Sequence, residues 1–160
     1  MKKFSTEITW SLIFIVMMLL WMLMEKLTGL HDVNIDMHPI VTNLVAIPAI
    51  LIYVLALLDK RKKYYGGSMT YLQGFTTGVI MTVIITLFTP LIQYITSVYI
   101  TPDYFTNVIA YTVEKGEMTQ EEAEEYFNLI NYMIMSLYGS FVMGLITTSI
   151  VAIFTKKKAA

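Results

Sequence analysis

The chain has 160 residues, of which 56% are hydrophobic, and its formal net charge at pH 7 is −1. This hydrophobic fraction exceeds the roughly 45–50% of ordinary soluble domains, so we expect a protein that resides in a lipid bilayer. A net charge so close to zero argues against nucleic acid as a partner. The sequence contains no cysteine, which excludes disulfides and thiolate metal sites.

Four apolar stretches are each long enough to cross a membrane as a helix. A helix needs about 20 residues to span the hydrocarbon core, where it satisfies its own backbone hydrogen bonds. The stretches cover about residues 8–24, 40–58, 71–95 and 129–154, and Glu7 and Glu25 flank the first. We therefore predict an all-α fold, an integral membrane four-helix bundle in which residues 1–160 form a single transmembrane domain.

The positions of the basic residues predict the orientation of these spans, because lysine and arginine are retained on the cytoplasmic side. With four spans, Lys2, Lys3 and the basic residues at 60–63 and 156–158 all fall on one side. We therefore predict a multi-pass protein of the cytoplasmic (inner) membrane with both termini cytoplasmic. The strongest single signal is the turn between the second and third spans, with Lys60, Arg61, Lys62 and Lys63.

The polar connection between the third and fourth spans, residues 101–128, has the features of two helices. Thr101 is placed to cap a first helix, and Gly116 is placed to end it. Thr119 and Glu122 have the spacing of a capping box, which would begin a second helix. We therefore predict an extracytoplasmic helical hairpin in this segment.

The acidic residues of this outer segment allow two interpretations. They form a docking surface or a lid, or they only keep a helical connection in water, which is what charge runs usually do. The candidate interaction surface consists of Pro102, Asp103, Glu121 and Glu122.

Small residues recur at every fourth position in the third and fourth spans. Such a stripe lets two helix backbones approach each other closely. We expect it to serve packing within the chain first and a homodimer second. The residues are Gly74, Gly78, Ser136, Ser140, Gly144, Thr148 and Ala152.

The loop at residues 31–38 contains His31, Asp32, Asp36 and His38, which are donor types that suit zinc or another divalent ion. Their spacing matches no established pattern, so we predict no metal site and retain His31 and His38 only as weak candidates. No catalytic motif or dinucleotide fingerprint is present, so we expect neither an enzyme nor a cofactor.

Three short motifs resemble landmarks of the bacterial domain-of-unknown-function family 4199. They are GGSMTYLQGFTTG at the start of the third span, YITPDY at residues 99–104 and GEMTQEE at residues 116–122. The order and spacing of the spans match as well, from about residue 8 to residue 155. One departure is Gly74, where the family pattern has alanine. The resemblance implies a small bacterial membrane protein and brings no established activity.

Two functions remain open. The first is a non-enzymatic accessory or interaction subunit, whose partner is a membrane protein or a second copy of the chain. The alternative is a carrier for a small solute or a lipid, built on the second and third spans, which Pro48 and Pro90 are expected to kink. No span contains an ionisable residue away from its ends, which disfavours ion-coupled transport. We predict the first function.

Overall fold

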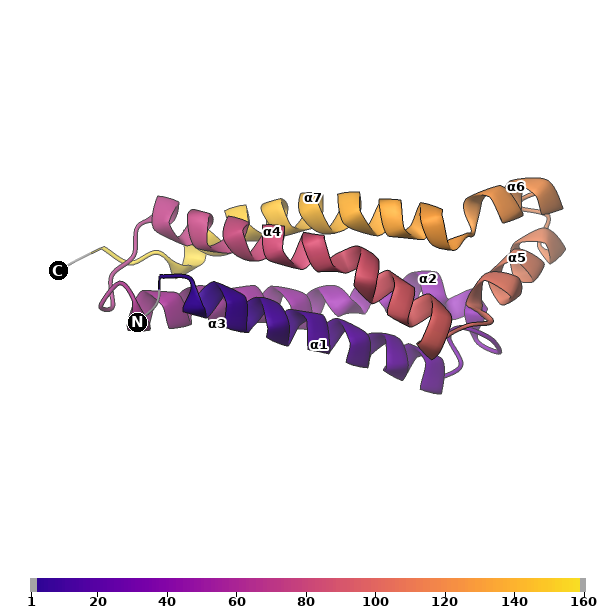
Figure 1. Ribbon diagram of the computed structural model, residues 1–160, viewed down its shortest axis with the longest axis horizontal. Helices are drawn as coiled ribbons and strands as arrows, with labels where there is room; N and C mark the ends of the chain where they lie inside the picture. The colour runs from indigo at the N-terminus through magenta and orange to yellow at the C-terminus, as the bar shows by residue number, and fades with distance from the viewer. Residues whose placement is uncertain (1–2, 159–160) are drawn as a thin grey trace. The chain divides into compact units, whose positions relative to one another are not determined.

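The computed structural model describes residues 3–158, nearly all of them in helices or the turns between them (Figure 1). In this range there is no strand, only an isolated bridge between Met69 and Lys157. Lys2, part of the predicted orientation signal, lies outside the described residues. Four helical segments are long and apolar enough to cross a membrane: Ser5–Leu27, Ile35–Lys63, Tyr71–Ile100 and Leu129–Thr155. The predicted all-α fold with four spans is therefore confirmed.

The chain packs as two units, each described here by itself. The first contains residues 3–17, 46–88 and 137–158, and the second contains residues 18–45 and 89–136. The helix α3 (Ala46–Lys63) belongs to the first unit. Three helices contribute residues to both units: α1 (Ser5–Leu27), α4 (Tyr71–Ile95) and α7 (Leu129–Thr155).

Apolar side chains from all four of these helices fill the core of the first unit. Phe14 of α1 meets the ring of Tyr53 of α3 edge-on, with 6.0 Å between the ring centroids. The Tyr53 hydroxyl lies 2.9 Å from Oγ1 of Thr82 in α4, which gives a buried phenol the partner that it needs. The buried cluster consists of Ile52, Tyr53, Ala56, Leu57, Met69, Met81, Ile85, Val151 and Ala152.

Two glycines allow α4 and α7 to approach closely within the first unit. A Cβ atom placed on Gly78 would lie 2.5 Å from the side chain of Thr148, and one on Gly144 would lie 2.5 Å from Thr82. Both distances are shorter than a van der Waals contact, so these two positions require glycine. Several residues of the predicted stripe therefore pack within the chain, whereas a homodimer stays a prediction.

The other residues of the stripe have different surroundings. A Cβ on Gly74 would lie 3.2 Å from the methyl group of Met69, a tight contact that a small shift of this flexible side chain would relieve. Ser140 donates a hydrogen bond to Oγ1 of Thr86 at 3.2 Å, and Ala152 is fully buried. Ser136 instead bonds to the carbonyl of Met133 in its own helix.

The outer segment belongs to the second unit and folds into two helices that pack against each other, α5 (Tyr104–Glu114) and α6 (Gln120–Tyr126) (Figure 1). The predicted capping box is confirmed, since Thr119 and Glu122 each bond to the backbone N–H of the other. Gly116, with φ +70°, follows the end of α5 as predicted. The helical hairpin is thus present.

The predicted cap of α5 by Thr101 is wrong, because Asp103 occupies the N-cap position. A π-helical turn, η3 (Thr96–Ile100), prolongs α4 to the residue before Thr101. The Thr101 backbone N–H and hydroxyl both donate to the carbonyl of Thr96, at 2.7 and 3.2 Å. Thr101 therefore ends one helix instead of beginning the next.

The second span begins with short helical pieces in the second unit. These are η1 (Ile35–Met37), α2 (His38–Val41) and η2 (Thr42–Val45), and α3 then follows. Pro48 lies in the first turn of α3, where its missing N–H breaks no internal helical hydrogen bond. The short helical pieces of the second span therefore all lie before Pro48. In the third span, Pro90 lies inside α4.

Candidate functional site

Two histidines and a glutamate come together in the second unit. Glu25 lies near the end of α1, His31 follows in the next turn, and His38 begins α2. The Nε2 atoms of His31 and His38 lie 3.1 and 3.5 Å from the same oxygen, Oε2 of Glu25. Glu25 is fully buried, and His31 is only 6% exposed. The candidate ligand atoms of all three residues lie within 4.8 Å of one another, so the cluster has the donors and the spacing to hold a metal ion.

The loop aspartates considered with the histidines do not join this cluster. Asp32 and Asp36 are exposed, and Asp32 accepts a hydrogen bond from the backbone N–H of Val33. Glu25 was expected only to flank the first span, so the sequence did not indicate it as the third member. One signal was present: Trp21 and Glu25 are four residues apart, a spacing that places both on one face of a helix.

Neighbouring side chains hold the glutamate and the histidines in place. The indole Nε1–H of Trp21 donates to Oε1 of Glu25 at 2.6 Å, which leaves Oε2 facing the two imidazole rings. The ring of Tyr104 lies 5.1 Å from the ring of His31 and 5.3 Å from that of His38, between centroids. Asn107 donates its amide N–H to the backbone carbonyl of His31 at 2.9 Å. The helix α5 thus contributes contacts to the histidine cluster.

The Tyr104 side chain is an uncharged neighbour of these histidines. Burial raises the pKa of its hydroxyl above the ordinary value, so the phenol stays protonated at neutral pH. The same hydroxyl lies 3.5 Å from that of Tyr132 in α7, and both rings contact Phe105. An aromatic group therefore adjoins the histidines within the second unit.

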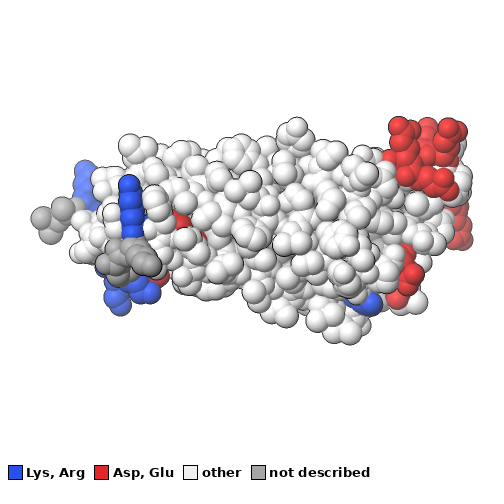
Figure 2. Space-filling model, viewed as in Figure 1, with Lys and Arg blue, Asp and Glu red and all other residues white. Residues whose placement is uncertain are grey.

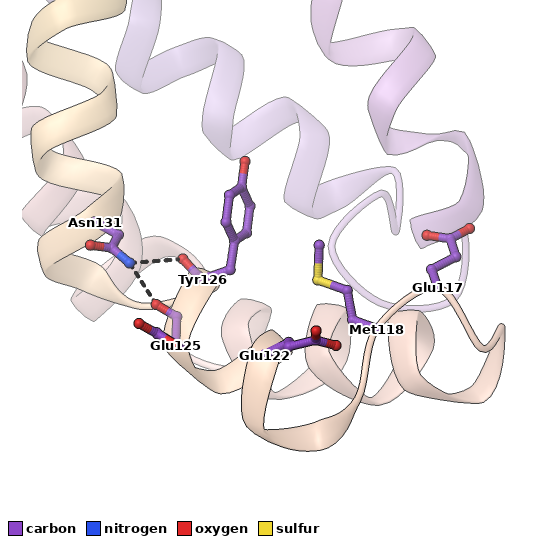
Figure 3. A pocket seen from close by; sticks show the side chains of 6 residues that line it. All are labelled: Glu117, Met118, Glu122, Glu125, Tyr126 and Asn131. Carbon is purple, nitrogen blue, oxygen red and sulfur yellow. Dashed lines mark hydrogen bonds between the residues drawn. The ribbon is translucent and has the colours of Figure 1, made fainter.

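A second feature of this unit is a groove of about 530 Å³ beside α6 (Figure 3). Asn131, near the start of α7, donates its amide N–H to the carbonyl oxygens of Glu125, at 2.6 Å, and Tyr126, at 3.4 Å, which holds the end of α6. The residues that line the groove are Glu117, Met118, Glu122, Glu125, Tyr126 and Asn131.

Acidic side chains gather on the surface that α5 and α6 form in the second unit (Figure 2). Among the residues that the structure describes, no salt bridge joins Glu117, Glu121 or Glu125 to a cation. Glu122 is engaged by the capping box, in which the Thr119 backbone N–H and hydroxyl lower the pKa of its carboxyl. Of the predicted surface, Glu122 lines the groove and Glu121 is exposed beside it on α6, whereas Pro102 and Asp103 are exposed before α5.

In the first unit, Lys60 in the basic last turn of α3 forms a buried ion pair. Nζ of Lys60 lies 2.8 Å from Oε1 and 2.9 Å from Oε2 of Glu7, and the two side chains are 3% and 2% exposed. Lys60 also donates to the backbone carbonyl of Lys3. This lysine, expected as part of an orientation signal, is therefore part of the packed interior of the unit.

The other basic residues of the turn are closer to the expected solvated arrangement. Arg61 donates from Nη1 to the carbonyl of Thr155 at 2.7 Å. Lys63 pairs with Asp59 at 2.8 Å, and Lys62 is exposed.

Comparison with known proteins places the chain in a known family. The family described as "Protein of unknown function (DUF4199)" matches residues 9–157. No curated protein and no solved structure matches the chain.

Proposed function

Because the chain belongs to the DUF4199 family, whose function is unknown, we propose a role on the basis of its structure. The protein is a non-enzymatic accessory or interaction subunit of the membrane that presents the outer segment, residues 101–128, to a partner. The observation that carries this proposal is the groove beside α6, whose lining includes three glutamates.

The chemistry of the groove indicates the kind of partner. Glu117 and Glu125 line it without a cation among the described residues, and Met118 and Tyr126 add adaptable apolar surface. Complementary charge guides association and selects partners. The proposed partner is therefore a membrane protein with a basic segment outside the membrane.

The same proposal includes the location and the orientation of the chain. The protein lies in the bacterial cytoplasmic membrane with both termini in the cytoplasm, because the basic residues gather on that side. The first unit supports an even number of crossings: Lys60 reaches Lys3, and Met69 exchanges backbone hydrogen bonds with Lys157 at 2.8 and 2.9 Å. The start of α1, the turn between α3 and α4 and the end of α7 thus meet in that unit (Figure 1).

A carrier for a small solute or a lipid is the second candidate. The observation that favours it lies in α4, where Pro90 lies inside the helix and the π-helical turn η3 follows its end. Such irregularities are frequent at functional sites and at points where helices bend. Proteoliposomes that contain the purified protein would release a trapped solute or exchange a labelled lipid faster than empty liposomes if this candidate held.

Co-purification under mild detergent tests the first candidate. A variant with Glu117→Gln, Glu121→Gln and Glu125→Gln removes charge from the groove and its edge but keeps the capping box. We expect the wild-type chain to retain a reproducible partner or a second copy, and the variant to lose it. A matched control with Asp32→Asn and Asp36→Asn changes exposed acids that lie outside the groove. Equal recovery with all three proteins would refute the proposal.

A further inference from the structure

We propose that Glu25, His31 and His38 form a binding site for a divalent transition-metal ion, and that zinc is the ion that this donor set suits best. The site lies in the second unit, and its ligand atoms lie within 4.8 Å of one another. The inference is independent of the function proposed above, because none of the three residues lines the groove beside α6.

Charge supplies the first argument. The helix α1 carries two fully or nearly fully buried glutamates, Glu7 at 2% exposure and Glu25 at 0%. Buried charges in proteins are paired or bind metal ions, because their desolvation is costly. Glu7 has Lys60 as its partner, at 2.8 Å. In the described part of the chain, the salt-bridge partners of Glu25 are two imidazoles and no lysine or arginine. A cation between these three side chains would neutralise the carboxylate.

The distances supply the second argument. In a tetrahedral zinc site with bonds of about 2.0–2.1 Å, neighbouring ligand atoms are about 3.3–3.4 Å apart. Oε2 of Glu25 lies 3.1 Å from Nε2 of His31 and 3.5 Å from Nε2 of His38. Both separations are within about 0.2 Å of the tetrahedral edge, a tolerance that metal sites commonly show. Two edges of a tetrahedral site are therefore already in place, and the ligand atoms of all three residues lie within 4.8 Å of one another.

The donor types select the class of ion. Imidazole suits zinc, copper, iron and nickel, whereas magnesium and calcium prefer oxygen ligands. Two histidines and one glutamate leave a fourth position of a tetrahedral zinc ion for a water or another ligand. The chain has only two histidines and no cysteine, so a nitrogen-bound metal on this protein would have to be bound by His31 or His38.

The surroundings indicate what the ion would stabilise. Trp21 holds the other oxygen of Glu25, in the manner of the outer hydrogen bonds that orient metal ligands. Asn107 of α5 bonds to the His31 carbonyl. A bound ion would therefore join the end of α1 to the start of α2 and hold the loop against which α5 packs.

Metal content and cobalt substitution test the site. The full chain is purified in mild detergent through a tag that contains no histidine, and then dialysed against zinc or cobalt. We expect about one zinc per chain, visible absorption typical of tetrahedral cobalt, and a higher unfolding temperature with zinc than with a chelator. Absence of zinc binding at micromolar concentration would overturn the proposal and leave the cluster as a histidine–glutamate pair.

Variants locate the ion on these residues. Glu25→Gln preserves the size of the side chain, and His31→Gln with His38→Gln removes both imidazoles; each should abolish stoichiometric zinc. Trp21→Phe should weaken zinc binding about 10- to 100-fold while the protein remains folded, since it removes only the bond that orients Glu25. The control, Asp32→Asn with Asp36→Asn, should bind like the wild type. Unchanged zinc content in the double-histidine variant, with an unchanged helical circular dichroism spectrum, would contradict the site.

Discussion

Lys60 and Glu7 form a buried ion pair in the first unit, with 2.8 Å between Nζ and Oε1. The two residues are distant in sequence, one near the start of α1 and the other near the end of α3. The pair therefore joins two helices at the same end of that unit. It also shows that a basic residue at the edge of a span can serve packing.

Loss of one partner of this pair should destabilise the protein. Lys60→Met leaves the Glu7 carboxylate buried without its cation, which typically costs about 3–5 kcal/mol of unfolding free energy. Thermal or denaturant unfolding in detergent would measure this change. Adding Glu7→Gln to Lys60→Met should recover most of the loss, because no uncompensated charge remains. Lys62→Met, at an exposed position of the same turn, is the control and should have little effect. Equal stability of the Lys60 and Lys62 variants would contradict the account.

The close contact of α4 and α7 predicts a sharp difference between glycines. Gly78→Ala and Gly144→Ala each place a methyl group 2.5 Å from a threonine side chain, and overpacking of this kind costs about 1–3 kcal/mol. Gly139 has no neighbouring atom within 4 Å of such a methyl group, so Gly139→Ala is the matched control on α7. Unfolding of the three variants in detergent would compare them. If Gly78→Ala were as stable as Gly139→Ala, the described packing would be wrong.

The spans could be predicted from the sequence because the bilayer imposes a length and an apolar composition on each crossing helix. The capping box at Thr119 and Glu122 was equally predictable, since it depends on a local spacing of residue types. Both features require only neighbours in the chain. The same reasoning failed for Thr101, because the π-helical turn before it could not be anticipated from local helix signals.

The candidate site was not assembled from the sequence, because its members are brought together by the turn after α1, in which the Leu30 N–H bonds back to the Glu25 carbonyl. Glu25 was expected at the edge of the membrane. The structure shows instead that its side chain is buried against His31 and His38. The loop aspartates were closer in sequence to the histidines and were therefore the natural candidates. The buried contact of Lys60 was not foreseen for the same reason, since its partner is Glu7 of α1, and its role as an orientation signal stays a prediction.

The capping box of α6 predicts a pH dependence. Bonds from Thr119 lower the pKa of Glu122 below its usual value of 4.5. The folded state therefore binds the proton less readily than the unfolded state, and the stabilisation is complete above the ordinary glutamate pKa. It is lost as the pH falls through the lowered pKa of the folded state. The protection of the amides at the start of α6 against hydrogen exchange, relative to the intrinsic exchange rate at each pH, should therefore fall at acid pH. The variant Glu122→Gln should lack this loss of protection.

Reporter fusions test the proposed orientation. A reporter enzyme that is active only outside the cytoplasm should be active when fused after Gly116, in the turn between α5 and α6, and inactive when fused after Lys62. A reporter that is active only in the cytoplasm should give the opposite pattern. Activity of the first reporter after Lys62 would reverse the orientation of all four spans.

Crosslinking in living cells tests the central claim, that the outer segment binds a partner, most directly. A photoreactive amino acid would replace Glu121, which is exposed on α6, and in a separate strain Lys62, which is exposed in the last turn of α3. The account predicts a discrete crosslinked product from position 121 and none of the same mass from position 62. The product from position 121 should disappear when Glu117 and Glu125 are changed to glutamine. No crosslink from position 121, or an identical product from both positions, would contradict the account.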